Sequence, residues 1–441
     1  MRKKSGKTAA LCVSVLFALA AGMTGCSADV EEMIVDTGGD TLTIGIISDT
    51  QLTENYDKYA QNLEKSLEYI KARDTDVLIF AGDYGDLGTQ ATADRFKSVY
   101  DGVFGDDKPI SLAVMGNHDY WLANFFDCWE IPFKSKMRGR LEGIFGDDYT
   151  TVKVINGYTF IALSPTDGSM EGKYDIAYAE KALDRAVQRD PDKPIFVITH
   201  QNPKGTIRGS DAWGNAELNE LFSRYPNVLS ISGHSHYSML DETNVMQTEY
   251  TAIGTQSLSY TDFDPGYEPV AATADIESNP MLLYMTVKGN TVDTERIFVN
   301  TGEEYDPENR YTFVFPYDKE NAAYGADRKD GAQAPVFENF FGGTTEVDGR
   351  TLITVKAAEC EGLVTEYRMR FLSDGEPVKF VRNGENVEKL KYFSDFFTGK
   401  NAEELSFAVP SDLPSGRYTV ELRALESFGN SSATVTFGIT I

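Results

Sequence analysis

Apolar runs and amphipathic stretches alternate along the first two thirds of the chain. Continuous apolar runs, which are typical of strands covered on both faces, occupy residues 42–48, 76–83, 109–119, 194–200 and 228–236. Stretches with the spacing of amphipathic helices lie between them, at residues 55–73, 89–104, 176–189 and 215–225. Strands that alternate with helices in this way predict a layered α/β architecture.

Two further stretches predict hairpins. Residues 149–164 turn at the Asn-Gly pair that starts at Asn156, and residues 281–299 turn at the Gly-Asn pair that starts at Gly289. With the runs above, they predict two sheets with helices on the outside. Residues 120–147 are aromatic-rich and show no clear period, so we expect an irregular inserted loop over one rim of the sheets.

The composition changes at residues 321–335, which we expect to be a linker or an exposed loop. The remainder, residues 336–441, contains no helical run, and apolar and polar side chains alternate in residues 366–373 and 416–432. A period of two over such a length predicts a β-sandwich. Its last stretch resembles the final hairpin of a fibronectin type III or Ig-like domain.

The first 25 residues have the pattern of an export signal. A basic start is followed by a short apolar stretch and by small residues that lead to Cys26. This end resembles the lipobox of bacterial lipoproteins, which implies cleavage before Cys26 and lipid on its sulfur. Residues 1–25 would then be the signal peptide and residues 26–40 a tether, and the exported protein would be membrane-anchored in the cell envelope. The alternative is a plain signal peptide cut near Ala28.

The net charge limits the possible partners. The formal charge is −27, and it falls to −31 once the four basic residues of the signal are removed. Such a surface repels polyanions, so no nucleic-acid groove is expected, and an anionic substrate would need a strong local positive source such as a metal. Outside the signal and the lipidation site only Cys128 and Cys360 remain, and we expect both to be free and buried.

Every histidine of the chain directly follows an apolar run: His118, His200, His234 and His236. Asp49 and the acidic segment 82–86 occupy the same kind of position. Ligands of open α/β sheets bind beyond the carboxyl ends of the strands, so five strand ends are expected to deliver these groups to one rim. Each group alone has an ordinary explanation as a helix cap or turn residue. Together, the imidazoles and carboxylates predict a site for divalent metals of hard or borderline character.

In this order the motifs resemble those of the calcineurin-like metallophosphoesterase superfamily, over about residues 41–300. The motifs are Asp49-x-Gln51, Gly82-Asp83-x-x-Asp86, Gly116-Asn117-His118-Asp119, His200 and Gly233-His234-x-His236. The resemblance implies a four-layer α/β/β/α sandwich over residues 41–320, with the all-β sandwich domain of residues 336–441 following it.

The resemblance also implies two divalent metal ions and a role for each motif. One metal would be held by Asp49, Gln51, Asp83 and His236, and the other by Asp83, Asn117, His200 and His234. A hydroxide that bridges the ions would attack phosphorus, His118 would protonate the leaving oxygen, and Asp86 would orient His118. The identity of the metals stays open among Mn²⁺, Fe²⁺/Fe³⁺, Zn²⁺ and Mg²⁺.

Two departures from the family pattern matter. Gln51 stands where the usual motif has a histidine, and a neutral amide oxygen is a harder and weaker ligand than imidazole. Either Gln51 is a weak ligand, or it hydrogen-bonds a water that serves as one. Leu87 and Asp119 replace the arginine and glutamate of phosphoprotein phosphatases, which favours the phosphodiesterase and purple-acid-phosphatase side of the superfamily. Asp119 itself is expected to be a turn or helix-cap residue.

These observations predict a metal-dependent hydrolase of phosphate esters, with phosphodiesters favoured over phosphomonoesters. The alternative is a catalytically weakened surface binding lipoprotein that acts through its β-sandwich. The oligomeric state is left open. Asn202 and Trp213 are candidates for the substrate side of the rim. The aromatic residues after His118 form either an apolar wall for a leaving group or the core of the insertion: Tyr120, Trp121, Phe125, Phe126, Trp129 and Phe133.

Overall fold

The computed structural model of the chain describes residues 29–122, 131–270 and 275–441. The signal peptide, Cys26 and Cys128 therefore lie outside the described residues, as do Phe125, Phe126, Trp129 and the side chain of Phe133. None of the described helices is long and apolar enough to cross a membrane.

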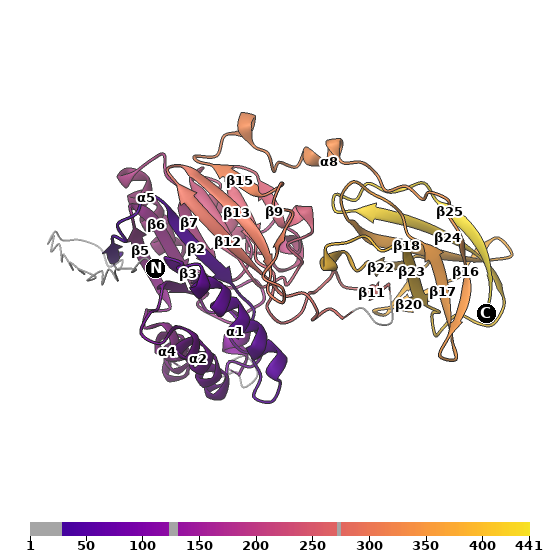
Figure 1. The fold of residues 1–441 in the computed structure, drawn as a ribbon, viewed down its shortest axis with the longest axis horizontal. Coiled ribbons are helices and arrows are strands. Elements are labelled where there is room, and N and C mark those ends of the chain that lie inside the picture. Colours follow the sequence, from indigo (N-terminus) through magenta and orange to yellow (C-terminus); the bar gives the residue numbers. More distant parts are fainter. Residues whose placement is uncertain (1–28, 123–130, 271–274) are drawn as a thin grey trace, which may run out of the picture.

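The N-terminal unit contains two sheets that pack face to face, with helices on their outer sides (Figure 1). The strands of the first sheet are, in spatial order, β1 (Glu32–Val35), β5 (Thr150–Ile155), β6 (Tyr158–Leu163), β7 (Ile195–Thr199), β8 (Val228–Ser232), β10 (Thr251–Gly254) and β9 (Val245–Gln247). Those of the second are β14 (Glu304–Tyr305), β13 (Thr291–Phe298), β12 (Met281–Lys288), β2 (Leu42–Ile47), β3 (Val77–Phe80) and β4 (Ile110–Ala113), with β15 (Tyr311–Val314) paired to β13. The four-layer α/β/β/α architecture expected from the sequence is confirmed.

Both faces of the central strands are buried, which explains their unbroken apolar sequences. Ile44 and Ile46 of β2 lie in the core between the sheets, whereas Ile47 lies in the core under the helices. The helices on the second sheet are α1 (Asp57–Ala72), α2 (Gln90–Phe104) and α4 (Ile131–Phe145). Those on the first sheet are α5 (Ile176–Arg189) and α7 (Ala216–Phe222). The short helices are η1 (His118–Tyr120), α6 (Ser210–Trp213), η2 (Glu242–Asn244), η3 (Lys319–Asn321), α8 (Arg328–Gly331) and η4 (Phe396–Thr398).

Both predicted hairpins are present. Ile155 pairs with Tyr158 across the Asn-Gly turn, whose residues both have positive φ. Lys288 pairs with Thr291 across the other turn, between β12 and β13. These turns set the register of the strands because a two-residue loop fixes which residues face each other.

The expectation of an irregular loop over residues 120–147 was wrong, because part of this segment is the helix α4. Met137, Leu141 and Ile144 are buried at helical spacing against the second sheet and its helices. Phe145, at the end of α4, stacks on Phe80 of β3 with 5.8 Å between ring centroids. The high aromatic content before the helix obscured this apolar spacing.

Part of the segment expected to be a tether is also ordered. β1 pairs in parallel with β5 at the edge of the first sheet, Val30 is buried, and Glu32 forms an ion pair with Arg189. Met33 and Ile34 remain exposed, as side chains of an edge strand often do. The acidic composition concealed this strand, because few of its side chains enter the core.

The C-terminal unit is built from strands, as the alternating pattern predicted. Its large sheet contains β11 (Tyr267–Pro269), β22 (Leu390–Phe393), β18 (Val364–Ser373), β24 (Arg417–Glu426) and β25 (Val435–Thr440), with β19 (Glu376–Pro377) on β18. Its smaller sheets contain β16 (Gly342–Val347), β17 (Arg350–Lys356) and β23 (Glu404–Ala408), and β20 (Phe380–Arg382) with β21 (Glu385–Val387). A hydrophobic core lies between the large sheet and β17 and β23. Cys360 is free and half-buried.

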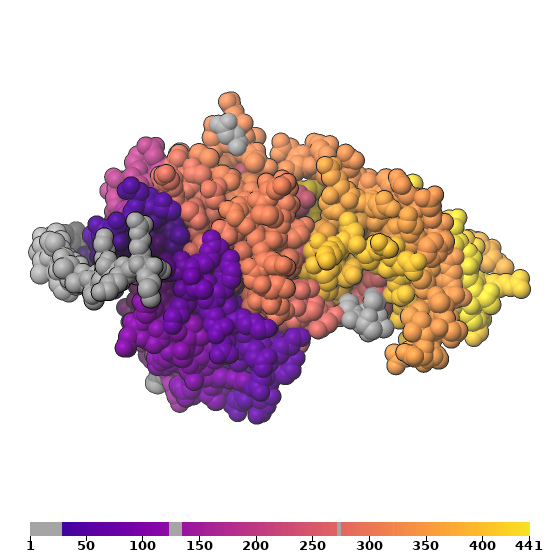
Figure 2. Space-filling view, viewed as in Figure 1, coloured from indigo at the N-terminus to yellow at the C-terminus, as the bar shows by residue number. Residues whose placement is uncertain are grey.

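The two units are joined by more than a linker. β11 belongs in sequence to the N-terminal unit but pairs in parallel with β22 of the large C-terminal sheet. Phe263, just before β11, stacks on Phe393 of β22 with 3.4 Å between ring centroids. Arg328, in the segment expected to be a linker, donates to the carbonyl oxygen of Val245 at 2.6 Å. The two units accordingly touch where their facing ends meet in the middle of the molecule (Figure 2).

Candidate metal centre

The strand ends singled out by the sequence converge from both sheets. Asp49, Asp83 and Asn117 follow β2, β3 and β4 of the second sheet, whereas His200 and His234 follow β7 and β8 of the first. Ligand atoms of Asp49, Asp83 and His200 all lie within 4.8 Å of one another, and all three residues are buried. The two sheets thus meet at one polar cluster, which is a candidate site for metal ions.

Asp83 lies at the centre of this cluster. Its Oδ1 accepts the backbone N–H of His118 at 2.9 Å, and its Oδ2 accepts Nε2 of Gln51 at 3.0 Å. Oδ2 is also 3.2 Å from Nε2 of His200. Burial raises the pKa of Asp83, but the charges of the neighbouring imidazoles lower it by more. The net effect is a lowered pKa of Asp83. Asp83 is therefore ionised and lies at the centre of the candidate metal site.

His200 is oriented so that one ring nitrogen faces the cluster. Its Nδ1 lies 2.8 Å from the carbonyl oxygen of Ala81, which fixes this nitrogen as the N–H donor. Its Nε2 then faces two oxygen acceptors, Oδ2 of Asp83 and, at 3.0 Å, Oδ1 of Asn117. Burial alone would lower the pKa of His200, but the charge of Asp83 raises it to about 9. A nitrogen between two oxygen atoms needs a proton or a metal ion there.

Asp49 is linked to the last motif of the site. Its Oδ1 lies 3.1 Å from Nε2 of His236, and both of its oxygens accept the backbone N–H of His234 at 3.2 Å. Ser48 donates its hydroxyl to the same carboxylate. Burial opposes ionisation, but His236 and His200 lower the pKa of Asp49 overall.

Several buried polar atoms of the cluster have no hydrogen-bond partner among the described residues. They are Oε1 of Gln51, Nε2 of His234 and Nδ1 of His236. Burial, followed by the charge of His200, lowers the pKa of His234 to about 3, so this ring is neutral and keeps a lone pair at neutral pH. Unpaired buried acceptors are costly in a protein. Because these are oxygen and nitrogen donors beside two carboxylates, the residues present fit divalent metal ions.

His118 lies at the edge of the cluster. Its Nδ1 is 2.8 Å from the carbonyl oxygen of Asp86 and 3.6 Å from the carboxylate of the same residue. Its ring stacks on Trp121 at 5.1 Å. Burial would lower the pKa of His118, but Asp83 and the contacts with Asp86 raise it to about 10. The sequence predicted the pairing with Asp86, but the shorter contact comes from the backbone carbonyl.

Asp119 fastens two of the motif loops together. Its Oδ2 accepts the backbone N–H groups of Gly116 at 2.8 Å and Asp83 at 3.1 Å, and its Oδ1 accepts that of Tyr84 at 3.0 Å. Burial, followed by the charge of Asp83, raises the pKa of Asp119 well above the usual range. The structural role expected for Asp119 is therefore larger than a turn or cap, since it positions Asp83.

Five residues of the cluster have positive φ angles although none is glycine: Asp49, Gln51, Asp83, His234 and His236. Such a conformation costs about 1–3 kcal/mol at a residue with a large side chain. Glycine is needed where the loops touch: a Cβ at Gly116 would lie 2.0 Å from Oδ1 of Asp83, and one at Gly233 would lie 2.4 Å from Oδ2 of Asp49. Surrounding hydrogen bonds hold this strained backbone in place, so the site is pre-organised.

A sixth strand end contributes to the site and was not identified from the sequence. Ser257 and Ser259, which follow β10, donate their hydroxyls to the carbonyl oxygen of Asp49 at 2.8 and 3.1 Å. The ring of Tyr260 lies 4.5 Å from that of His236. The sequence pattern could have indicated this strand end. The segment TAIGTQSLSY, like the other motifs, is a short apolar run followed by polar residues.

Of the residues that the sequence suggested for the substrate side of the site, some lie at its rim and others are buried in the interior. Trp213 lies 6.3 Å from the ring of His234, and Trp121 is 40% exposed beside His118, so both stand at the rim. Tyr120 is fully buried and belongs to the core. Asn202 is also fully buried, and its amide donates to Ser232 Oγ at 2.8 Å, which supports the loop before His234.

Comparison with known proteins agrees with this geometry. Residues 42–238 match the family model described as calcineurin-like phosphoesterase, so this part of the chain is similar to that family. No curated protein matches the chain.

Similar solved structures include a dimetal phosphatase from Danio rerio, with 10% identity and a TM-score of 0.44 over 62% of this chain and 99% of that one. A purple acid phosphatase from yellow lupin (Lupinus luteus) has 14% identity and a TM-score of 0.44 over 62% of this chain and 54% of that one. GAP50, the anchor in the inner membrane complex of Plasmodium, has 16% identity and a TM-score of 0.41 over 64% and 92%. At these TM-scores the likenesses carry no conclusion about this chain.

Proposed function

We propose that the chain is a metal-dependent hydrolase of phosphate esters, exported and anchored to the membrane through lipid at Cys26. The observation that carries the proposal is the setting of Asp83, a buried ionised carboxylate shared among Gln51, His200 and the backbone of His118. Unpaired nitrogen and oxygen donors surround it. The phosphoesterase family match over residues 42–238 supports the reaction class.

The donors fall into two sets that share Asp83. One ion would be held by Asp49, Asp83, His236 and Oε1 of Gln51, and the other by Asp83, Asn117, His200 and His234. Bound divalent ions would neutralise charge on the phosphoryl group and activate water as the nucleophile. The first set contains a single imidazole, so we propose Mn²⁺ or Mg²⁺ there in preference to Zn²⁺.

His118 would supply the proton to the leaving oxygen. Its Nδ1 is occupied by the carbonyl oxygen of Asp86, so Nε2 is the end of the ring that can reach a substrate. The raised pKa of His118, about 10, keeps this ring protonated at neutral pH in the metal-free protein. Trp121 covers one face of the ring and limits its motion. A positioned acid of this kind contributes about 10²–10⁴-fold to the rate.

The residue that follows Asp86 favours phosphodiesters as the substrates. Leu87, next to Asp86, is 41% exposed and apolar at the position where phosphoprotein phosphatases have an arginine. A phosphomonoester carries about one more negative charge than a diester at neutral pH. The absence of a cation at residue 87 therefore penalises the monoester more than the diester.

Metal analysis and two chromogenic substrates test the proposal. Purified protein should contain bound metal and should hydrolyse bis-nitrophenyl phosphate faster than mono-nitrophenyl phosphate when Mn²⁺ is added. His118→Ala should retain the metal and lose about 10²-fold or more in kcat. Arg417→Gln, an exposed change in the C-terminal unit, is the control and should behave as wild type. A protein that holds no metal and turns over neither ester would instead be a binding protein that acts through its C-terminal unit.

A further inference from the structure

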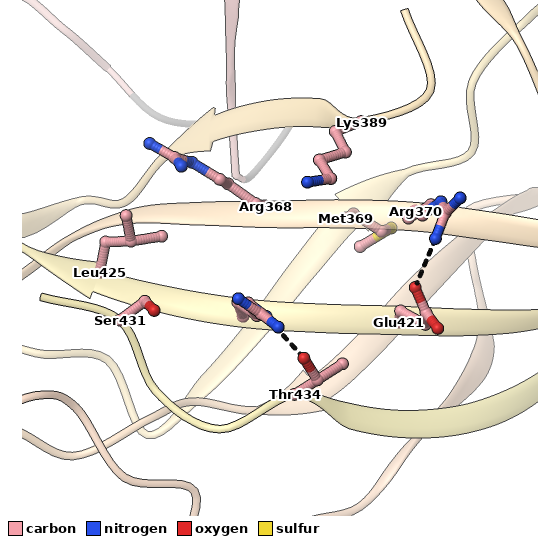
Figure 3. Close-up of a pocket in the computed structure, with 9 residues that line it drawn as sticks. Arg368, Met369, Arg370, Lys389, Glu421, Leu425, Ser431 and Thr434 are labelled. Carbon is pink, nitrogen blue, oxygen red and sulfur yellow. Dashed lines mark hydrogen bonds and ion pairs between the residues drawn. The ribbon is translucent and has the colours of Figure 1, made fainter. Parts of the chain in front are cut away.

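The outer face of the large C-terminal sheet gathers positive charge on a chain whose net charge is −27. Arg368 and Arg370 project from β18, Arg423 from β24, and Lys389 and Lys391 lie at β22. We call these five residues the cationic face. Figure 3 shows Arg368 and Arg370 along β18 and Lys389 beside that strand, and all three line a pocket.

The register of the strands places three of these cations side by side. Arg368 pairs with Lys391 on one neighbouring strand and with Arg423 on the other. Like charges directly opposite each other on one face of a sheet are destabilising. A row of three is therefore a cost to folding unless anions outside the chain offset it.

The carboxylates nearby do not balance the cationic face. Arg370 forms long ion pairs, 3.4 Å to Glu421 and 3.3 Å to Glu388, and Arg368 pairs with Glu366. Among the described residues, no carboxylate pairs with Lys389, Lys391 or Arg423. Arg423 instead donates its Nε to the hydroxyl of Thr434, and Lys391 lies 5.2 Å from the ring of Tyr267.

The pocket at the cationic face has the size and the donors for an oxyanion. Its volume is about 170 Å³, and its lining includes Arg368, Arg370, Lys389 and Arg423. Nε of Arg370 is buried there and has no hydrogen-bond partner within the described part of the chain. Guanidinium groups present paired N–H donors that match the oxygens of a phosphate group. Although Glu421 also lines the pocket and pairs with Arg370, the remaining donors there are suited to an anion from outside the chain.

We propose that the cationic face, a local exception on a surface that otherwise repels polyanions, binds successive phosphate groups of a polymer linked by phosphate esters, and that this polymer is the substrate of the metal centre. The row from Lys391 to Arg423 crosses three strands, about 10 Å, which is wider than one phosphate group. The row also continues to Tyr267 of β11, which pairs with Lys391. The choice of phosphate as the anion, in place of another oxyanion, rests on the proposed function.

The same row leads toward the metal centre. Three residues before Tyr267, Asp264 accepts the hydroxyl of Tyr237 at 2.6 Å, and Tyr237 directly follows His236. The segment of residues 264–267 therefore borders both the cationic face, through Tyr267, and the loop that follows His236, through Asp264. A membrane surface is less well matched, because an unpaired Arg370 Nε inside a pocket suits a discrete group better than a flat layer of charge.

Binding of inorganic polyphosphate, a chain of phosphate groups without ester bonds, is measured by calorimetry on the full-length protein without added metal and tests whether the cationic face holds successive phosphate groups. Wild type should bind it, and Arg368→Gln with Arg423→Gln should weaken binding about tenfold or more. Arg417→Gln is the matched control, since this exposed arginine lies on the same strand outside the pocket. The double variant Lys389→Gln with Lys391→Gln should also weaken binding. It replaces the arginine double variant in the test if that variant does not fold. Equal binding by wild type and the variants overturns the proposal, and so does binding only to vesicles of anionic phospholipid.

The outcomes separate this inference from the proposed function. Hydrolysis of bis-nitrophenyl phosphate should be unchanged by the arginine substitutions, because that small ester does not need the cationic face. Polyphosphate binding without any ester hydrolysis would leave the cationic face standing and remove the proposed function. Ester hydrolysis without polyphosphate binding would leave the proposed function standing and overturn the proposal for the cationic face.

Discussion

Nε2 of Gln51 donates to Oδ2 of Asp83 at 3.0 Å, while Oε1 of the same side chain is buried and finds no partner in residues 29–122, 131–270 and 275–441. This contact places residue 51 within reach of the ion that Asp83 and Asp49 would share. It accounts for the departure from the family motif: the amide keeps its place in the cluster as a neutral oxygen donor.

Substitution of Gln51 by histidine should tighten the first metal and shift its preference toward Zn²⁺ or Fe, because imidazole is the stronger ligand for these ions. Metal affinities of the two proteins, measured by competition with a chelator, check this. We expect an increase of about tenfold or more for Zn²⁺ and little change for Mg²⁺. Unaltered affinities for every ion would mean that residue 51 is not a ligand.

Gly116→Ala should displace Asp83 and abolish binding of both ions. A Cβ at Gly116 would lie 2.0 Å from Oδ1 of Asp83, which is far inside contact distance. Gly102→Ala is the matched control, because Gly102 lies in α2 with no atom within 4 Å of a new Cβ. The control should keep its metal and gain about 0.5–1 kcal/mol of stability from helix propensity. Full metal content in Gly116→Ala would refute the close packing of these loops.

Asp86→Asn should reduce kcat far less than His118→Ala. The carbonyl oxygen of Asp86 holds Nδ1 of His118 at 2.8 Å, and this backbone group survives the substitution, whereas the carboxylate is 3.6 Å away and half-exposed. We expect a loss of about tenfold or less, together with a lowered pKa of His118 in the pH–rate profile. A loss as large as that of His118→Ala would make the carboxylate the dominant partner.

The stability of the metal-free protein should depend on pH through His234. Its pKa falls from 6.5 to about 3 on folding, because of burial and then His200. Between these values only the unfolded chain binds the proton, so this contribution to stability is complete above pH 6.5 and is lost as the pH falls toward 3. The slope is at most about 1.4 kcal/mol per pH unit.

Chemical denaturation of metal-free wild type and His234→Gln at several pH values measures this slope. The variant should lose less stability than wild type as the pH falls below neutral. His118 and His200 have raised pKa values, so their contributions are complete below pH 6.5 and decline at higher pH, and both residues remain in the variant. Parallel pH profiles for the two proteins would contradict a neutral buried His234.

Phe263→Ala should loosen the segment that joins the metal centre to the C-terminal sheet. The ring of Phe263 stacks on Phe393, and the same segment carries Ser257 and Ser259, which hold Asp49. We expect a loss of up to about 3 kcal/mol in stability, faster amide exchange over residues 255–269 and weaker metal binding. Phe341→Ala, at a 47% exposed phenylalanine, is the control and should leave exchange in that segment unchanged.

Most of the fold followed from the sequence, because each layer left a distinct pattern. Strands buried on both faces appear as unbroken apolar runs, and the residue pairs of the two-residue turns predicted both hairpins. The helix α4 was missed because its buried face, Met137, Leu141 and Ile144, is interrupted by basic residues and preceded by many aromatics. The edge strand β1 was missed because its side chains are mostly exposed.

The site was predicted residue by residue where polar groups directly follow strands, and the structure brings all of those residues together. Two contributions could not be read from motifs. The contact from Asp86 to His118 is made by the backbone carbonyl, so the identity of the side chain does not reveal it. The three bonds to Asp119 depend on how two loops approach each other, which is a property of the packed fold and not of either segment alone.

The strand β11 has a consequence for how such a protein can evolve. A recombination that exchanged the C-terminal unit at residues 321–335 would leave β11 behind, deprived of its partner β22, and would give the incoming sheet an open edge. The C-terminal unit is therefore not exchangeable at residues 321–335 without breaking the sheet that β11 and β22 share.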